Sequence, residues 1–221
     1  MKMKNLAAGA AVAVAAAAVV SCTSGSVAST EASVSIEKKD KVLVVVDVQR
    51  DFFDPSGSLY VGGSEALPEK IAAIADEYDA IVFTLDWHPG NHCSFAEQGG
   101  IWPSHCVAYT QGAGLPDCFS PILAKGENYV QLFFKGNVQS EEQYGAFEEL
   151  AEDSVIMAWL KNADNVDVCG IAGDYCVKES TANLLKIVPA EKVTMLLDCI
   201  RSIDDGSTLN AFVEENSLKT K

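Results

Sequence analysis

The sequence predicts an α/β protein with a doubly wound, mostly parallel sheet and helices on both faces. Five apolar runs rich in β-branched residues recur along the chain, as expected for strands that are buried on both faces of a parallel sheet. Amphipathic segments alternate with these runs, which is the pattern of successive βαβ units. At 221 residues, the chain fits one such domain once an N-terminal targeting segment is set aside.

The expected strands are short and almost continuously hydrophobic. They are "VLVVV" (42–46), "AIVFTL" (80–85), "YVQLFF" (129–134), "VDVCGIA" (166–172) and "KVTMLL" (192–197). The expected helices cover residues 67–78, 154–163 and 175–187. From Asp86 to Asn128 the sequence has little periodicity but is rich in Gly, Pro, His and Trp. Long loops of this kind inside a compact domain are usually functional or disordered, and its Trp and His residues favour a function.

The N-terminus has the features of a bacterial export signal. Lys2 and Lys4 precede an apolar run that is shorter than the roughly 20 residues of a membrane-spanning helix. The run ends in "VVSC" (19–22), which resembles the lipobox of bacterial lipoproteins. This resemblance implies cleavage before Cys22 and a lipid anchor on Cys22. The alternative is simple secretion, in which Cys22 has no role.

Three segments follow from this interpretation. Residues 1–21 are the expected signal peptide, residues 22–40 a lipid-anchored flexible tether rich in Ser and Thr, and residues 41–221 the folded domain. We therefore expect an exported lipoprotein, periplasmic or on the cell surface. The net charge of −15 argues against a nucleic-acid partner, and membrane contact is expected only through the anchor. The sequence leaves homo-oligomerisation open.

Seven cysteines in an exported protein raise the question of disulfides. Cys169 and Cys199 lie in apolar runs and are expected in the core. A pairing of Cys106 with Cys118 stays open.

Four chemically active residues follow expected strands. They are Asp47, Asp86, Lys135 and Cys176. Ligands of open α/β sheets bind beyond the carboxyl ends of the strands, so these four side chains are expected to meet at one edge of the sheet. Taken alone, these residues have plainer interpretations. Cys176 could be a core residue, Asp47 could cap the following helix, and Lys135 could be a solvated loop residue. Together they predict a thiol nucleophile with a base and a fixed positive charge, and the start of a helix favours a thiolate at Cys176.

All three histidines of the chain lie close behind Asp86. Asp86 and His88 are two residues apart, so in an extended segment both side chains point the same way. With His105 as a third ligand, they would suit one divalent metal ion, Zn before Fe or Mn, with coordination positions open for water or substrate. His92 is the weakest candidate. The alternative is a set of surface histidines bonded to their neighbours.

Five motifs together resemble the nicotinamidase/pyrazinamidase branch of the isochorismatase-like hydrolases. They are "DVQRDFF" (47–53), "DWHPGNHCSF" (86–95), "WPSHCV" (102–107), "FKG" (134–136) and "GIAGDYCVKESTANLL" (170–185). The resemblance implies that residues 41–221 form an isochorismatase-like hydrolase domain with a catalytic triad and a metal site. The implied triad is Asp47, Lys135 and Cys176, and the implied metal ligands are Asp86, His88 and His105.

The resemblance also implies further site residues. The backbone N–H groups of Ala172 and Cys176 would form the oxyanion hole, after a cis peptide between Ile171 and Ala172. Phe52 and Trp102 would enclose a pyridine ring, although Phe52 could equally be a core residue and Trp102 a loop anchor. His92 matches a position that binds the metal in some members.

The implied activity is hydrolysis of nicotinamide, and of pyrazinamide, to the acid and ammonia through a thioester on Cys176. Two alternatives remain at this point. One is a related cysteine hydrolase of another small amide or ureide, which the Asp86–His88–His105 set disfavours. The other is a lipid-anchored protein that binds pyridines without turnover, which has no need of a triad. The segment "GNVQSEEQYGAF" (136–147) departs from the family pattern and leaves substrate preference in doubt.

Overall fold

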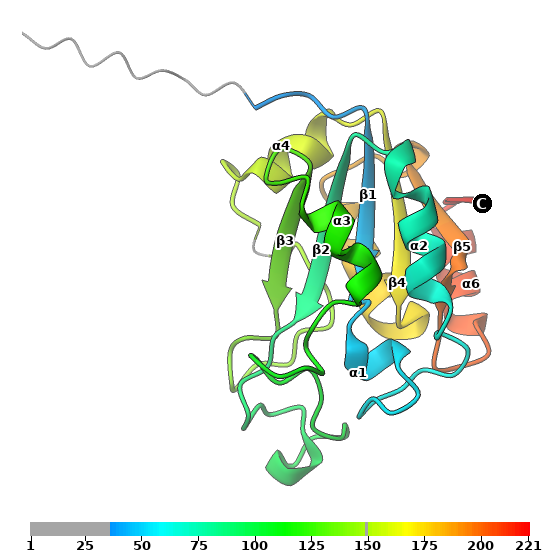
Figure 1. Ribbon diagram of the computed structural model, residues 1–221. Helices are drawn as coiled ribbons and strands as arrows, with labels where there is room; N and C mark the ends of the chain where they lie inside the picture. The colour runs from blue at the N-terminus through cyan, green and yellow to red at the C-terminus, as the bar shows by residue number, and fades with distance from the viewer. Residues whose placement is uncertain (1–35, 149) are drawn as a thin grey trace, which may run out of the picture. The chain divides into compact units, whose positions relative to one another are not determined.

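A six-stranded, fully parallel sheet forms the centre of the protein in the computed structural model, which describes residues 36–148 and 150–221 (Figure 1). The strands are β1 (Lys41–Val46), β2 (Ala80–Asp86), β3 (Val130–Lys135), β4 (Asn165–Ile171), β5 (Val193–Arg201) and β6 (Lys219–Thr220). Their order in the sheet is β3-β2-β1-β4-β5-β6. The chain therefore reverses its direction of winding between β1 and β4, which is where ligands bind in such sheets.

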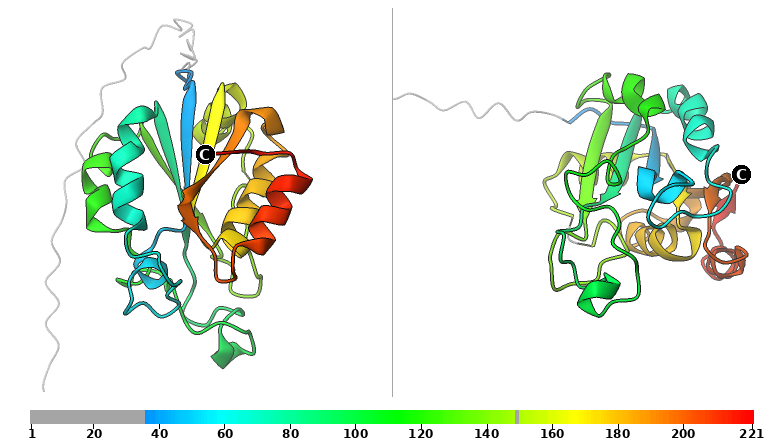
Figure 2. Two further views of the ribbon diagram at one scale, coloured as in Figure 1. Left: turned by 90° about the vertical axis from the view of Figure 1, so that its right-hand side faces the viewer. Right: turned by 60° about the horizontal axis from the view of Figure 1, so that its bottom comes forward.

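Helices cover both faces of the sheet, so the predicted doubly wound α/β fold is confirmed. The helices are α1 (Arg50–Phe53), α2 (Leu67–Ile74), α3 (Ser120–Leu123), α4 (Val155–Asn162), α5 (Lys178–Leu184) and α6 (Ser207–Glu215). Figure 2 shows α2 and α3 on one face and α5 and α6 on the other. The loops that connect strands to helices gather at the carboxyl edge of the sheet (Figure 1).

The core is built around β1, whose residues from Val42 to Val46 are almost completely buried. β1 lies between β2 and β4, and Val44 pairs with Val82 on one side and Val168 on the other. Burying a valine side chain stabilises the fold by about 1.5–3 kcal/mol, so this β-branched strand anchors both halves of the sheet.

The expected strand 129–134 is displaced by one residue and is less buried than predicted. β3 is an edge strand with β2 on one side, and the side chains of Leu132 and Phe134 are 41% and 42% exposed. The hydrophobicity of the segment indicated burial on both faces, but an edge position leaves one face partly open.

The helix expected over 175–187 is two structures. Residues Gly173–Val177 form a π-helical turn, in which the N–H groups of Tyr175 and Val177 both donate to the carbonyl of Ala172, and α5 follows. The other expected helices are shorter than predicted. α2 continues into a 3-10 turn over Ala75–Glu77, and the Ser154 hydroxyl caps α4 by accepting from Met157 N at 3.1 Å.

Within the described residues all six cysteines are free, so Cys106 and Cys118 are not paired. Cys169 and Cys199 are buried, as predicted. The signal peptide and the lipidation site Cys22 lie outside the described residues. Of the residues that the structure covers, none belongs to a helix of the length and apolarity needed to cross a membrane.

Candidate active site

The four residues predicted at strand ends meet at the carboxyl edge of the sheet. The Lys135 ammonium is their centre: Nζ lies 2.8 Å from Asp47 Oδ2 and 3.6 Å from Cys176 Sγ, and it forms an ion pair with Asp86 Oδ1. All four side chains are buried. Their placement puts a thiol, two carboxylates and an ammonium in direct contact out of water.

Strand pairing explains this meeting. Asp86 and Lys135 are the last residues of neighbouring strands and are register partners. Asp47 follows β1 directly and has a φ of 50°, a backbone conformation that few non-glycine residues adopt. It is held there because Asp47 N donates to the Thr84 carbonyl at 3.1 Å, and the Thr84 hydroxyl donates to Asp47 Oδ1 at 2.6 Å.

A residue that sequence reasoning missed, Gln49, fixes the backbone of Asp86. Its side-chain carbonyl accepts from Asp86 N at 2.8 Å, and its amide donates to the carbonyls of Asp86 and Ala113 at 2.8 and 2.9 Å. Gln49 is fully buried. The amide thus continues the hydrogen bonding of the sheet past the end of β2, and its place in "DVQRDFF" is the only sequence signal for it.

Burial and charge set the protonation of the centre. Burial raises the pKa of Asp47 above its usual value, although Lys135 opposes this effect. Burial also opposes ionisation of Asp86, but Lys135, His88 and His105 together outweigh it and hold the Asp86 pKa below its usual value. Burial would lower the pKa of Lys135, yet the facing carboxylates of Asp47 and Asp86 raise it, so the ammonium stays charged.

The resting form of Cys176 differs from the prediction. A position at a helix start beside Lys135 was expected to favour the thiolate. Burial instead raises the pKa of the Cys176 thiol well above its usual value, against the lowering effect of Lys135. This direction favours the protonated thiol, and a base with a raised pKa, Asp47, lies in the same cluster.

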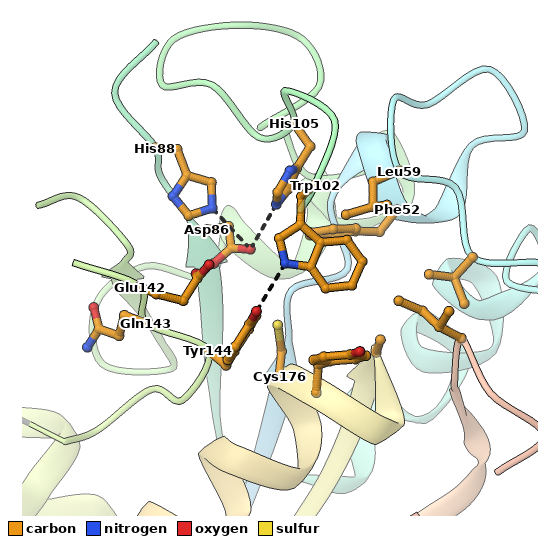
Figure 3. Close-up of a pocket in the computed structure, with 14 residues that line it drawn as sticks. Phe52, Leu59, Asp86, His88, Trp102, His105, Glu142, Gln143, Tyr144 and Cys176 are labelled. Carbon is orange, nitrogen blue, oxygen red and sulfur yellow. Dashed lines mark hydrogen bonds and ion pairs between the residues drawn. The ribbon is translucent and has the colours of Figure 1, made fainter. Parts of the chain in front are cut away.

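Asp86 also belongs to a second group, which it forms with His88 and His105 on the side away from Lys135 (Figure 3). His88 Nε2 and His105 Nε2 lie 3.6 and 3.9 Å from Asp86 Oδ2, and the ligand atoms of the three residues are within 4.8 Å of one another. The Nδ1 atom of each imidazole is hydrogen-bonded to a backbone carbonyl. His88 Nδ1 lies 2.8 Å from the Gly136 carbonyl, and His105 Nδ1 lies 2.8 Å from the Pro103 carbonyl. These bonds aim both Nε2 atoms at Asp86, so the donor set fits a divalent metal ion.

His92 does not complete this group. Its ring stacks on His88 with 4.2 Å between centroids. Its Nδ1 is 2.7 Å from the Ser94 hydroxyl and its Nε2 is 3.0 Å from the Glu141 carbonyl. Both ring nitrogens are therefore engaged, and His92 supports His88 by packing.

The backbone at Gly136 must approach His88 closely. Gly136 has a φ of 64°, and a Cβ there would lie 2.4 Å from His88 Cε1. The Gly136 N–H donates to the Gln143 side chain at 2.9 Å. The glycine in the motif "FKG" is thus required by the position of His88.

A pocket opens between the thiol and the Asp86–His88–His105 group (Figure 3). Phe52 and Trp102 both line it, as predicted from the resemblance. The Trp102 indole donates to the Tyr144 hydroxyl at 3.1 Å and packs edge-on against Tyr175, with 5.1 Å between centroids. Tyr144 and Tyr175 also line the pocket, and sequence reasoning missed both, although they belong to the quoted segments 136–147 and 170–185.

The residues predicted to form the oxyanion hole also belong to this pocket. Ala172 and Cys176 both line it. The peptide bond between Ile171 and Ala172 is cis, as the resemblance implied. The missed carboxylate of Glu142 lines the pocket from the segment after β3, and burial raises its pKa.

Comparison with known proteins assigns the chain. The nicotinamidase/pyrazinamidase of Mycobacterium tuberculosis is 34% identical over 183 residues, which span 79% of this chain and 93% of the relative. The chain belongs to the nicotinamidase/pyrazinamidase family. No protein-family model matches it.

Solved structures of this family support the fold. PnC1 from L. infantum in complex with nicotinate is 33% identical, with a TM-score of 0.70 over 82% of this chain and 91% of that protein. The pyrazinamidase of Pyrococcus horikoshii in complex with zinc is 30% identical, with a TM-score of 0.66 over 82% of this chain and 98% of that protein. The predicted resemblance to the nicotinamidase/pyrazinamidase family is thus confirmed.

Proposed function

We propose that this protein is a metal-dependent cysteine amidohydrolase that converts nicotinamide to nicotinic acid and ammonia, and that it also hydrolyses pyrazinamide. One observation carries the proposal: the Cys176 sulfur, with Lys135 and Asp47, faces the Asp86–His88–His105 group across an aromatic pocket. The nicotinamidase/pyrazinamidase relative and the nicotinate complex in the family support the choice of substrate.

The pocket first orients the ring. Phe52 and Trp102 offer apolar faces, and Tyr144 and Tyr175 hold Trp102 in place. Asp86, His88 and His105 would hold one divalent ion, Zn before Fe or Mn, and when bound it supplies a Lewis-acidic position for the ring nitrogen, directly or through water. Fixing the ring in this way brings the carboxamide carbon to the sulfur and replaces a chance encounter between them.

The chain's own residues then perform the chemistry. Asp47 takes the proton of the Cys176 thiol, and the sulfur attacks the carboxamide carbon to form a C–S bond. The negative charge on the amide oxygen is stabilised by the N–H groups of Ala172 and Cys176, each worth about 3 kcal/mol in comparable sites. Asp47 passes its proton to the amine, and the C–N bond breaks to release ammonia.

The second half of the reaction regenerates the thiol. Asp47 removes a proton from water, which attacks the thioester carbon. The C–S bond breaks, and the proton returns to the sulfur while nicotinic acid leaves. Throughout, the Lys135 ammonium balances the carboxylates of Asp47 and Asp86, so neither buried charge is left without a partner.

The test combines turnover with metal analysis of residues 23–221. The protein as purified should release ammonia from nicotinamide. Cys176→Ala should lower kcat by about a thousandfold or more, as expected when a nucleophile is removed, while the metal content stays unchanged. Pyridine binding without ammonia release would identify a binding protein instead. Loss of the metal in Cys176→Ala would show that the sulfur is a ligand, and the assignment would be wrong.

We also propose that the enzyme acts outside the cytoplasm, tethered through lipid on Cys22. The basic N-terminal residues, the apolar run and "VVSC" (19–22) support this proposal.

A further inference from the structure

The catalytic cluster contains a second potential metal site. Besides the Asp86–His88–His105 group, the ligand atoms of Asp47, Asp86 and Cys176 also lie within 4.8 Å of one another, and all three side chains are buried. Thiolate and carboxylate are both strong zinc ligands. A protein that keeps a thiol nucleophile next to a metal centre therefore needs a device that keeps metal away from the sulfur.

Lys135 occupies this second site. Its Nζ contacts Asp47 Oδ2 at 2.8 Å, Cys176 Sγ at 3.6 Å and Asp86 Oδ1. Asp47 Oδ2 is buried and is reached by the ammonium as an ion pair, without hydrogen-bond geometry. The only partner of Asp47 Oδ2 among the described residues is therefore the positive charge of Lys135, which marks the place of Nζ as a position for a cation.

Asp86 divides its two oxygens between the two positions. Oδ1 faces the ammonium of Lys135, and Oδ2 faces the imidazoles of His88 and His105. A carboxylate that bridges two cations in this way is the arrangement of two-metal sites, in which the ions are about 3.5–4 Å apart. Here the second cation is covalently tethered to the end of β3.

We propose that the Lys135 ammonium is a built-in substitute for a second metal ion, which fills the Asp47–Asp86–Cys176 site and so prevents a divalent cation from ligating the nucleophile. This deepens the proposed function, because it rests on Cys176 being the nucleophile. The register pairing of Asp86 with Lys135 supplies the ammonium at this position permanently, so free metal competes poorly with it. The balance of charge agrees: with Lys135 absent, two carboxylates face one bound ion, and a second divalent cation meets less repulsion.

The geometry makes the site usable once the lysine is removed. Zinc binds sulfur at about 2.3 Å and carboxylate oxygen at about 2.0–2.2 Å, so its ligands must lie about 3.5 Å apart. Removing the buried stem of Lys135 leaves space for the side chains of Asp47, Asp86 and Cys176 to approach one another to this separation. Binding would break the S–H bond of Cys176, form a metal–sulfur bond and release the proton to solvent.

The experiment uses Co²⁺ as the probe on the chain from residue 23 to residue 221. Wild-type protein should bind one Co²⁺ and show no sulfur-to-cobalt charge-transfer absorption, even in excess Co²⁺. Lys135→Ala should bind two, show that absorption, and have its Cys176 alkylated by iodoacetamide at least about tenfold more slowly when Co²⁺ is present.

Two controls isolate the cause. Lys178→Ala removes a positive charge from the chain outside this cluster, where Lys178 pairs with Glu179, and should keep one Co²⁺ per chain. Lys135→Ala combined with Cys176→Ala should lose the charge-transfer absorption. Since Lys135→Ala leaves buried carboxylates unpaired, Lys135→Ser is the second variant, and both are also refolded in the presence of Co²⁺.

Each outcome decides the proposal. Two bound ions and a cobalt–sulfur band in either Lys135 variant support it. A single bound ion with no band, a failure of both variants to fold even with Co²⁺, or a cobalt–sulfur band in the wild type would overturn it. Nicotinamide turnover by the wild type is measured separately, so a failure of the proposed enzyme activity is distinguishable from a failure of this inference.

Discussion

At the scale of single residues, the position of the His88 imidazole depends on a glycine. Gly136 accepts the His88 Nδ1 hydrogen bond through its carbonyl, and its missing side chain leaves room for the ring. The segment after β3 therefore controls the position of His88 within the Asp86–His88–His105 group.

Gly136→Ala should weaken metal binding. A Cβ at 2.4 Å from His88 Cε1 must push the ring or the backbone away, and disturbing the support of a ligand typically lowers metal affinity by about 10- to 100-fold. Competition with a chromophoric chelator measures the affinity. Gly126→Ala is the matched control, because Gly126 also has a positive φ, of 84°, but nothing lies within 4 Å of the added Cβ. Equal metal affinities in the two variants would contradict the role assigned to Gly136.

The thiol of Cys176 should react slowly in the metal-free protein at neutral pH. Burial raises its pKa, and a raised thiol pKa means a smaller thiolate fraction than in a free cysteine, whose pKa is about 8.5. The rate of alkylation of Cys176 by iodoacetamide, followed by peptide mass spectrometry, should rise about tenfold per pH unit from pH 7 to pH 9 without levelling off. A plateau below pH 8 would show that the resting residue is already a thiolate.

The sequence predicted the positions of the reactive residues better than their protonation. Asp47, Asp86, Lys135 and Cys176 were predictable because parallel strands end at the same edge of a sheet. The raised pKa of Cys176 was not, because the burial that causes it arises only in the folded protein. Gln49 and Tyr144 were missed for a similar reason, since their roles are contacts with residues distant in sequence.

At the scale of elements, the Gln49 side chain joins the ends of β1 and β2. Truncation in Gln49→Ala should lower the free energy of unfolding by about 2–4 kcal/mol, because it leaves Asp86 N–H and two buried carbonyls without partners. Urea unfolding measures the change. Gln131→Ala is the control, since Gln131 donates to the Glu127 carbonyl near the surface, and it should change stability by less than about 0.5 kcal/mol. Similar losses in both variants would show that the Asp86 contacts are not what Gln49 contributes.

The elements show where periodicity is a reliable guide. β1, β2 and β4 were predicted within one residue, because strands inside a parallel sheet are hydrophobic throughout. The π-helical turn at Gly173–Val177 has no such signature, since it depends on both Tyr175 and Val177 bonding to one carbonyl. The two-residue β6 was also missed, because it is too short to show any pattern.

At the scale of the whole molecule, the proposed lipidation of Cys22 would decide where the enzyme works. Expressed as the full chain in a bacterial host, the protein should sediment with membranes and incorporate an alkyne-labelled fatty acid. Cys22→Ala should lose the label, because the proposed acyl chain is attached to the Cys22 sulfur. Cys118→Ala removes a cysteine from the folded domain and should behave as the wild type. A native chain that is soluble and carries no label would leave simple secretion as the interpretation.

The winding order of the sheet has a further consequence for biosynthesis. β3, β2 and β1 bring Lys135, Asp86 and Asp47 together, whereas Cys176 comes from β4 on the opposite flank of β1. The sulfur is therefore the last of the four to leave the ribosome, and it joins its partners only when β4 docks on a strand made more than a hundred residues earlier. A nascent or clipped chain that ends before Cys176 therefore carries the charges of Asp47, Asp86 and Lys135 but lacks the proposed nucleophile.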